Sequence, residues 1–481
     1  MEMGSVATRS PGPVHTAVAG RLAAVSPSVP ARVPSNVSAP ESSDPVSRVG
    51  FLVLLVFVFS STCRIFDFVL LGLHIPLVLS IVAAVFTLLG GGLRTALQTR
   101  TGKLMCLFTL WLIICVPFSS WKGGSFELLR DTWAKSLLVF LMVAGSAASV
   151  ARVKWMITAI AVGTAAAGGL ALELGYRPYG RLSLPSGYLS NANDFAQALL
   201  MGMCFLPVLL ANSTNIFRRI LVAAGVLFFL YVILSTGSRA ALLTAILIGV
   251  LGTLDTSPMR RLALFGAFCT IGIAALLVAP NAARSRLSTL VGGGEDAANS
   301  LDQIARASAE GRKNMLLDSI VLTFKHPLFG VGPGQFQTAE ADYTHQQGKA
   351  AIWLETHNAY TQVSSETGIP GFLIFFGVFG TCLIGLARVR KATRNNPRLQ
   401  STYRVLNPLW LGFIAFAVTS FFSSVAYQLY LSLLLGLCAA AIAAAERELA
   451  ASARRSPANP IAVGGTPQSS LRPASFARIR G

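Results

Sequence analysis

The sequence predicts an all-α fold, namely a polytopic membrane helix bundle of about 12 transmembrane helices with one large loop between spans 9 and 10. Hydrophobic residues make up 53% of the chain and charged residues 12%, whereas a soluble domain carries about 25% charged residues. Apolar stretches recur along the chain at roughly the 20-residue length that a transmembrane helix needs. They do not alternate as the strands of a membrane barrel do. This composition excludes an ordinary soluble enzyme.

Twelve stretches of the sequence are apolar and long enough to be these spans. The first two are separated by a polar interruption at Arg64 and Asp67. Backbone groups cannot stay unpaired in hydrocarbon, so each span is expected to be a helix. The predicted spans are 49–66, 72–91, 104–120, 133–150, 155–174, 194–212, 217–235, 239–254, 261–279, 367–387, 405–424 and 427–446.

The distribution of Lys and Arg predicts the orientation of these spans. If the N-terminus is cytoplasmic, the short cytoplasmic loops hold fifteen of these cations and the short outer loops hold seven. Cations favour the cytoplasmic side, so both termini are expected there. The formal net charge of +19 then lies wholly on the cytoplasmic side, where it faces anionic membrane lipid. The charge therefore does not indicate a nucleic-acid partner.

The seven cysteines lie in or beside apolar runs and lack the spacing of metal ligands. We expect buried small hydrophobic residues rather than a disulfide framework. The outer side also lacks a carboxylate-rich metal motif, so neither a metal nor a cofactor is expected.

Two tails and one long loop lie outside the apolar spans. Residues 1–48 and 451–481 have the composition of disordered cytoplasmic tails. Residues 281–360 form the loop, and loops of this length usually have a role. Within the loop, apolar residues at helical spacing predict a helix over Ile304–Lys325, lying on the membrane surface or covering the bundle. Spans 1–9 then occupy 49–280, and spans 10–12 occupy 361–446.

A first candidate for anion binding joins spans 7 and 8. Residues Ser235 to Arg239 form a turn that opens a helix, whose free N–H groups and positive dipole end lie beside the arginine. Arginine stays charged and can donate two hydrogen bonds, which suits a phosphate or a diphosphate. The alternative is a helix cap with an arginine that reaches outward to the membrane surface.

Two further polar groups fall on the same predicted side. Arg181 precedes span 6 together with Asn193 and Asp194. The arginine could add charge to an anion site, while Asn and Asp side chains also cap helices. Arg312 lies on the predicted loop helix, where a plain surface charge is the alternative. The Gly- and Pro-rich stretch 326–334 is expected to end that helix and reverse the chain.

His357 is the candidate proton acceptor. It precedes span 10 at the outer side, is followed by Asn358, and is one of five histidines. Histidine is the side chain best suited to take a proton near neutral pH. Glu355 and Glu366 flank His357 and could orient it or raise its pKa. A purely structural histidine is the alternative.

In this order, the features resemble the O-antigen ligase and polymerase superfamily, whose members are bacterial envelope glycosyltransferases. The resemblance extends over about residues 180–388. Their shared order around one large outer loop is more specific than any single motif. The motifs are Asn193-Asp194-Phe195-Ala196, Thr236-Gly237-Ser238-Arg239, Arg312 followed by His326-Pro327-Leu328-Phe329-Gly330-Val331-Gly332, and His357-Asn358-Ala359-Tyr360 with Glu366-Thr367-Gly368-Ile369-Pro370-Gly371.

The resemblance implies a reaction at the periplasmic face of the bacterial inner membrane. Family members take a glycan from undecaprenyl diphosphate. Ligases pass it to lipid A–core, and polymerases pass it to another lipid-linked repeat unit. The resemblance also implies that the reaction needs neither a metal nor a cofactor.

The resemblance assigns roles by motif position. Arg239 and Arg312 would bind the diphosphate, with Arg181 as a looser match. Such cations stabilise the negative charge that develops on the leaving group. His357 would be the general base. The supporting residues would be Glu366, Asn358 and Asn193.

Other functions remain open for the same sequence. An exopolysaccharide or O-antigen repeat-unit polymerase uses the same motifs, and no feature of the sequence decides the acceptor. A secondary transporter, or a flippase of the lipid-linked glycan, would form no new glycosidic bond. Transporters usually show repeat symmetry and charges at the midplane of the membrane, and the sequence shows no convincing repeat. The sequence therefore favours an O-antigen ligase-like glycosyltransferase.

Overall fold

The computed structural model of the protein describes residues 45–455, with gaps at 70–72, 212–214, 260, 265, 267–269, 271, 273–299, 349 and 351–352. Within these residues the regular elements are helices, and none is a strand. The predicted all-α fold is confirmed to this extent. The predicted tails lie outside the described residues, apart from 45–48 and 451–455.

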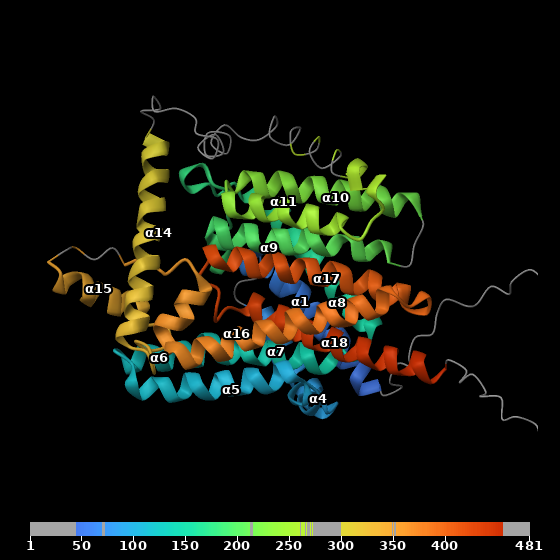
Figure 1. Ribbon diagram of the computed structural model, residues 1–481, viewed down its shortest axis with the longest axis horizontal. Coiled ribbons are helices and arrows are strands. Elements are labelled where there is room, and N and C mark those ends of the chain that lie inside the picture. The colour runs from blue at the N-terminus through green and yellow to red at the C-terminus, as the bar shows by residue number, and fades with distance from the viewer. Residues whose placement is uncertain are drawn as a thin grey trace, which may run out of the picture. The chain divides into compact units, whose positions relative to one another are not determined.

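The helices are labelled as in Figure 1. They are α1 (Pro45–Cys63), α2 (Phe66–Val69), α3 (Ile75–Leu89), α4 (Gly92–Gln98), α5 (Arg100–Cys115), α6 (Lys122–Glu127), α7 (Ala134–Ser146), α8 (Val150–Leu174), α9 (Ala192–Phe205), α10 (Ile216–Ser235), α11 (Arg239–Thr253), α14 (Ser300–Lys325), α15 (Phe336–Gln346), α16 (Ala359–Arg394), α17 (Gln400–Thr419) and α18 (Leu429–Arg454).

Eight of the described helices, three of them extended by short 3₁₀ turns, are long and apolar enough to cross a bilayer. A bent pair, α3 and α4, meets at 78° and could form a ninth span. The predicted span 133–150 corresponds to α7, which has 13 residues and follows a π-helical turn. The span predicted at 239–254 is the 15-residue α11. Span 261–279 lies mostly outside the described residues, so the count of twelve is not confirmed.

Helix α9 is the most enclosed part of the bundle. All 14 of its residues are buried, and it packs against α8, α10 and α17, with α17 beside it in Figure 1. The amide of Gln197 donates to the Phe416 carbonyl and to the Ser420 hydroxyl, each at 3.1 Å. These bonds satisfy a polar side chain in apolar surroundings. They also tie α9 to the end of α17.

Small residues allow α1, α8 and α9 to approach closely. A Cβ atom added to Gly202 of α9 would lie 2.0 Å from the Thr164 hydroxyl of α8. One added to Gly163 would lie 2.0 Å from the Thr62 hydroxyl of α1. Membrane helices use glycine and threonine in this way because lipid supplies no hydrophobic force between them. The close contacts make these three helices one packed layer.

Asp255 ties the ends of three helices together. It follows α11, and its carboxylate accepts hydrogen bonds from Arg390 and Arg394 of α16. The Tyr403 hydroxyl of α17 donates to the same carboxylate at 2.9 Å. The charges therefore pair with one another at this end of the bundle.

The predicted loop helix is confirmed as α14, which covers Ser300–Lys325. It runs across the direction of α16 in Figure 1 and packs against that helix. The Thr323 and Ser364 hydroxyls join the two helices at 2.9 Å. The Gly- and Pro-rich stretch 326–334 ends α14, and α15 follows and packs back against it. The predicted reversal of the chain is confirmed.

Candidate active site

The start of α9 positions the first arginine. The Asn191 side chain accepts from the Asn193 N–H at 2.9 Å and so caps the helix. This places Asn193 in the first turn. Arg181 donates to the Asn193 side-chain oxygen at 2.6 Å and to the Thr236 carbonyl at 3.0 Å. The Arg181 guanidinium is therefore held between α9 and the turn that precedes α11.

The turn between α10 and α11 carries the second arginine. Gly237 has φ 60°, which a glycine adopts without strain. Ser238 is the cap residue of α11, and Arg239 is its first helical residue. The Leu182 N–H donates to the Ser235 carbonyl at 3.0 Å, so the Arg181 segment and this turn are hydrogen-bonded neighbours. The N-terminal end of α11 adds a positive potential beside them.

His357 is held in an unusual backbone conformation. Its φ is 50°, in the left-handed region that non-glycine residues rarely occupy. Its N–H donates to the Ser424 hydroxyl at 2.9 Å. The Asn358 side chain accepts from the N–H groups of Tyr360 and Thr361 at 2.9 and 3.1 Å, which caps α16. The predicted supporting role of Asn358 therefore has a structural basis, because this cap fixes the chain beside the imidazole.

Two arginines act electrostatically on His357. Burial, followed by the positive fields of Arg312 and Arg181, lowers the pKa of His357 to about 4. The imidazole is then neutral at pH 7 and can accept a proton. The expectation that Glu355 and Glu366 could raise this pKa is wrong: the pKa is lowered, and neither glutamate is among its causes.

Asp194 is a site residue that sequence reasoning did not single out. It lies in the first turn of α9, is 8% exposed, and forms a side-chain hydrogen bond with Ser423. It also interacts electrostatically with Arg181, Arg312 and Glu355. Its Oδ1 atom has no hydrogen-bond partner among the described residues. In the sequence, a carboxylate at the start of an apolar span indicates either a site residue or a helix cap, and the sequence does not distinguish the two.

Glu366 has a different environment from the other predicted residues. It is 3% exposed, and its carboxylate accepts from the N–H groups of Gly334 at 2.8 Å and Phe336 at 3.4 Å. Gly334 lies between α14 and α15, and Phe336 is the first residue of α15. The Gly332 N–H donates to the Glu366 carbonyl at 3.0 Å, and a Cβ at Gly330 would lie 2.3 Å from the Glu366 backbone. Glu366 therefore anchors the turn that follows α14.

Replacing Glu366 by alanine is expected to lower the thermal stability of the detergent-solubilised protein. The change leaves the buried Phe336 N–H and the half-buried Gly334 N–H without their acceptor, at a cost of up to about 1–3 kcal/mol for a buried group. Glu366→Gln retains one acceptor oxygen and is expected to lose less. Thermal unfolding measures both variants, with exposed Glu310→Ala on α14 as the control. An unchanged unfolding temperature for Glu366→Ala would contradict the anchoring role.

The structure thus brings together most of the predicted residues from distant parts of the chain. Arg181, Asn193, Arg312 and His357 share one site, and the start of α11 with Arg239 adjoins it. The Glu366 carboxylate instead bonds the backbone at Gly334 and Phe336, after α14.

Comparison with known proteins agrees with this geometry. Residues 224–376 match a family model described as O-antigen ligase. The matched segment includes Arg239, Arg312, His357 and Glu366, whereas Arg181 lies before it. No curated protein matches the chain. The match and the apolar helices together support an O-antigen ligase-like membrane protein, and the predicted resemblance to that superfamily is confirmed over the matched segment.

Proposed function

We propose that the protein transfers a glycan from an undecaprenyl-diphosphate-linked donor to an acceptor sugar at the periplasmic face of the inner membrane. The observation that carries this proposal is the convergence of two arginines on a neutral histidine. Arg181 and Arg312 both act on His357. Fixed cations and a proton acceptor are the two groups that such a transfer needs.

In the proposed step the glycan moves from the diphosphate of the donor to a hydroxyl of the acceptor. The acceptor hydroxyl oxygen forms a bond to the anomeric carbon of the donor, and the bond from that carbon to the diphosphate oxygen breaks. The hydroxyl proton passes to His357. The negative charge that develops on the diphosphate lies among Arg181, Arg239 and Arg312. These cations stabilise the transition state more than the ground state, which is the requirement for catalysis.

The predicted orientation supports a periplasmic site. The starts of α9, α11 and α16 carry the site residues, and the cation bias assigns these ends to the outer side. The opposite end of α16 carries Arg390 and Arg394, which pair with Asp255. Both termini would then be cytoplasmic.

The function is tested by reconstitution into proteoliposomes with a diphospholipid-linked glycan and a panel of acceptors. We expect a new glycosidic product and released undecaprenyl diphosphate, and we expect transfer to survive excess chelator. A product formed with lipid A–core supports a ligase, and one formed with a second lipid-linked glycan supports a polymerase. Movement of the donor across the bilayer without a new bond would identify a flippase and overturn the proposal.

Arg239→Ala is expected to reduce transfer by about 10²–10³-fold, because the leaving diphosphate loses a positioned cation. Initial rates at saturating donor measure this loss. Exposed Arg177→Ala removes a charge of the same kind nearby and is expected to keep the wild-type rate. Equal rates for the two variants would remove Arg239 from the mechanism.

A further inference from the structure

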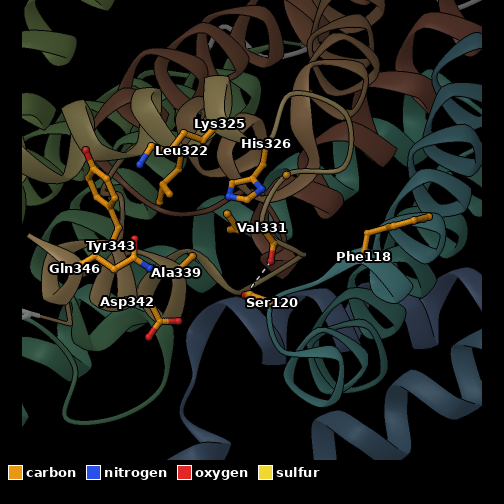
Figure 2. Close-up of a pocket in the computed structure, with 11 residues that line it drawn as sticks. Phe118, Ser120, Leu322, Lys325, His326, Val331, Ala339, Asp342, Tyr343 and Gln346 are labelled. Carbon is orange, nitrogen blue, oxygen red and sulfur yellow. Dashed lines mark hydrogen bonds between the residues drawn. The ribbon is translucent and has the colours of Figure 1, made fainter.

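A separate pocket lies where α14, α15 and the segment after α5 meet. Its volume is about 260 Å³. Phe118 forms one side, and Asp342, Tyr343 and Gln346 of α15 form the other, with His326 between them in Figure 2. None of these residues belongs to the active site described above.

The walls of the pocket are held in place by hydrogen bonds and packing. The Ser120 N–H and hydroxyl both donate to the Val331 carbonyl, at 2.9 and 3.0 Å. The Val331 N–H in turn donates to the Ser365 carbonyl of α16 at 2.8 Å. The Lys325 ammonium lies 3.9 Å from the centre of the Tyr343 ring, a favourable cation–π distance. The pocket is therefore pre-formed, as ligand sites usually are.

The polar groups of the pocket favour a neutral ligand with many hydroxyls. Lys325 can only donate hydrogen bonds, an ionised Asp342 can only accept them, and Gln346 does both. An anion would be attracted by the lysine and repelled by the aspartate, and a cation would experience the reverse. A sugar hydroxyl both donates and accepts, so it can satisfy both residues. The buried Leu322 and Val331 side chains provide apolar contacts for the C–H groups of a sugar ring.

The volume of the pocket and the side chains near it restrict the class of ligand further. A volume of about 260 Å³ lies just below the range of roughly 300–1,000 Å³ for drug-sized ligands, so the pocket suits a sugar unit rather than a whole glycan. Phe118 lines the pocket and is 57% exposed. Phe324 and Leu328, which stand one and two residues from the lining residues Lys325 and His326 in the sequence, are 72% and 62% exposed. Exposed apolar side chains grouped together are typical of a surface that contacts a membrane. A glycan that is anchored in the membrane can therefore reach this pocket.

The pocket lies toward the C-terminal end of α14, away from Arg312. Lys325 lies thirteen residues beyond Arg312 on the same helix, which corresponds to about 20 Å. Binding energy from such a remote part of a substrate can hold the reacting end in position.

We propose that this pocket binds one sugar unit of a lipid-anchored glycan substrate, at a distance from the bond that is formed. The proposal rests on the proposed function, because it assigns the ligand to a substrate of that reaction. Both the donor and the acceptor are lipid-anchored glycans, and they share the chemistry that the pocket recognises. Kinetic measurements can assign the pocket to one of them.

The test uses Ala339→Trp, which fills the pocket, and the double variant Asp342→Ala with Gln346→Ala. We expect KM to rise about tenfold or more for one substrate, which corresponds to about 1.4 kcal/mol, while kcat stays within about twofold. A rise for the acceptor or for the donor identifies the occupant. Exposed Lys313→Gln and His345→Ala, on α14 and α15 outside the pocket, are expected to leave both KM values unchanged.

A binding measurement separates this proposal from the proposed function. Saturation-transfer NMR of the wild-type protein with lipid-free oligosaccharides of the donor and of the acceptor reports sugar contact without turnover. Sugar contact that Ala339→Trp abolishes would support the pocket even if the wild-type protein transferred no glycan. Unchanged KM values for both substrates, together with unchanged NMR contacts in Ala339→Trp, would overturn the pocket and leave the transfer reaction standing.

Discussion

His357→Asn is expected to reduce glycan transfer by about 10²–10⁴-fold while the protein remains folded. The loss follows from removing the group that takes the acceptor proton, and the range is typical for a general base. Asparagine is the preferred replacement because the histidine has φ 50°, a conformation in which asparagine is several-fold enriched. His357→Ala is expected to lose as much activity but would also strain the backbone. Initial rates in proteoliposomes measure the effect.

His345→Asn provides the matched control, since His345 is an exposed histidine on α15 outside the site. Size-exclusion profiles and unfolding temperatures show whether each variant folds. His357→Gly adds a further readout, because glycine accepts the same φ and leaves space for added imidazole. Restored transfer with imidazole would identify a missing base. Wild-type rates in His357→Asn would remove the histidine from the mechanism.

Arg312→Gln is expected to lower kcat by about 10²–10³-fold and to move the pH profile as well. The loss of rate follows from losing a cation at the leaving diphosphate. The pH effect follows because Arg312 helps to lower the pKa of His357 to about 4. Without this arginine the pKa rises toward the ordinary value of about 6.5. Burial and Arg181 still hold it below that value.

The sign of the pH shift follows from the form of His357 that acts. The neutral imidazole is the base, and it predominates above the pKa. Activity therefore falls as the pH drops through the pKa, and a higher pKa moves this fall to higher pH. The acid limb of kcat/KM, which reports the free enzyme, measures the shift. Lys313→Gln, on the next residue of α14, is expected to leave the limb in place, and an unmoved limb in Arg312→Gln would contradict the electrostatic coupling.

Much of the fold could be predicted from local patterns. The helical spacing of apolar residues located α14, and the Gly- and Pro-rich stretch located its end. Apolar length was a less certain guide to where a helix ends. The span predicted at 133–150 ends at Ser146 in the structure, because Ser149 already caps the following helix, α8, which begins at Val150.

The site could be predicted by residue type but not by arrangement. His357 and the arginines are candidates in the sequence because ionisable groups near the membrane are costly and often functional. Their mutual positions depend on packing between segments that lie far apart in the chain. Burial, followed by Arg312 and Arg181, lowers the pKa of His357, and no local pattern links these positions. Most partners of Asp194 also lie far from it in the sequence, so the sequence alone favours a helix cap at this position.

The bonds of Gln197 have a consequence for how the protein is made. Its partners, Phe416 and Ser420, are synthesised 219 and 223 residues later. Helix α9 therefore enters the membrane long before its polar side chain can find its final acceptors. Membrane insertion of α9 and its final packing are therefore separate events. Between them, the Gln197 side chain lacks its final hydrogen-bond acceptors. A chain that stops before α17 would leave α9, all of whose residues are buried in the complete fold, without the acceptors of its Gln197 side chain.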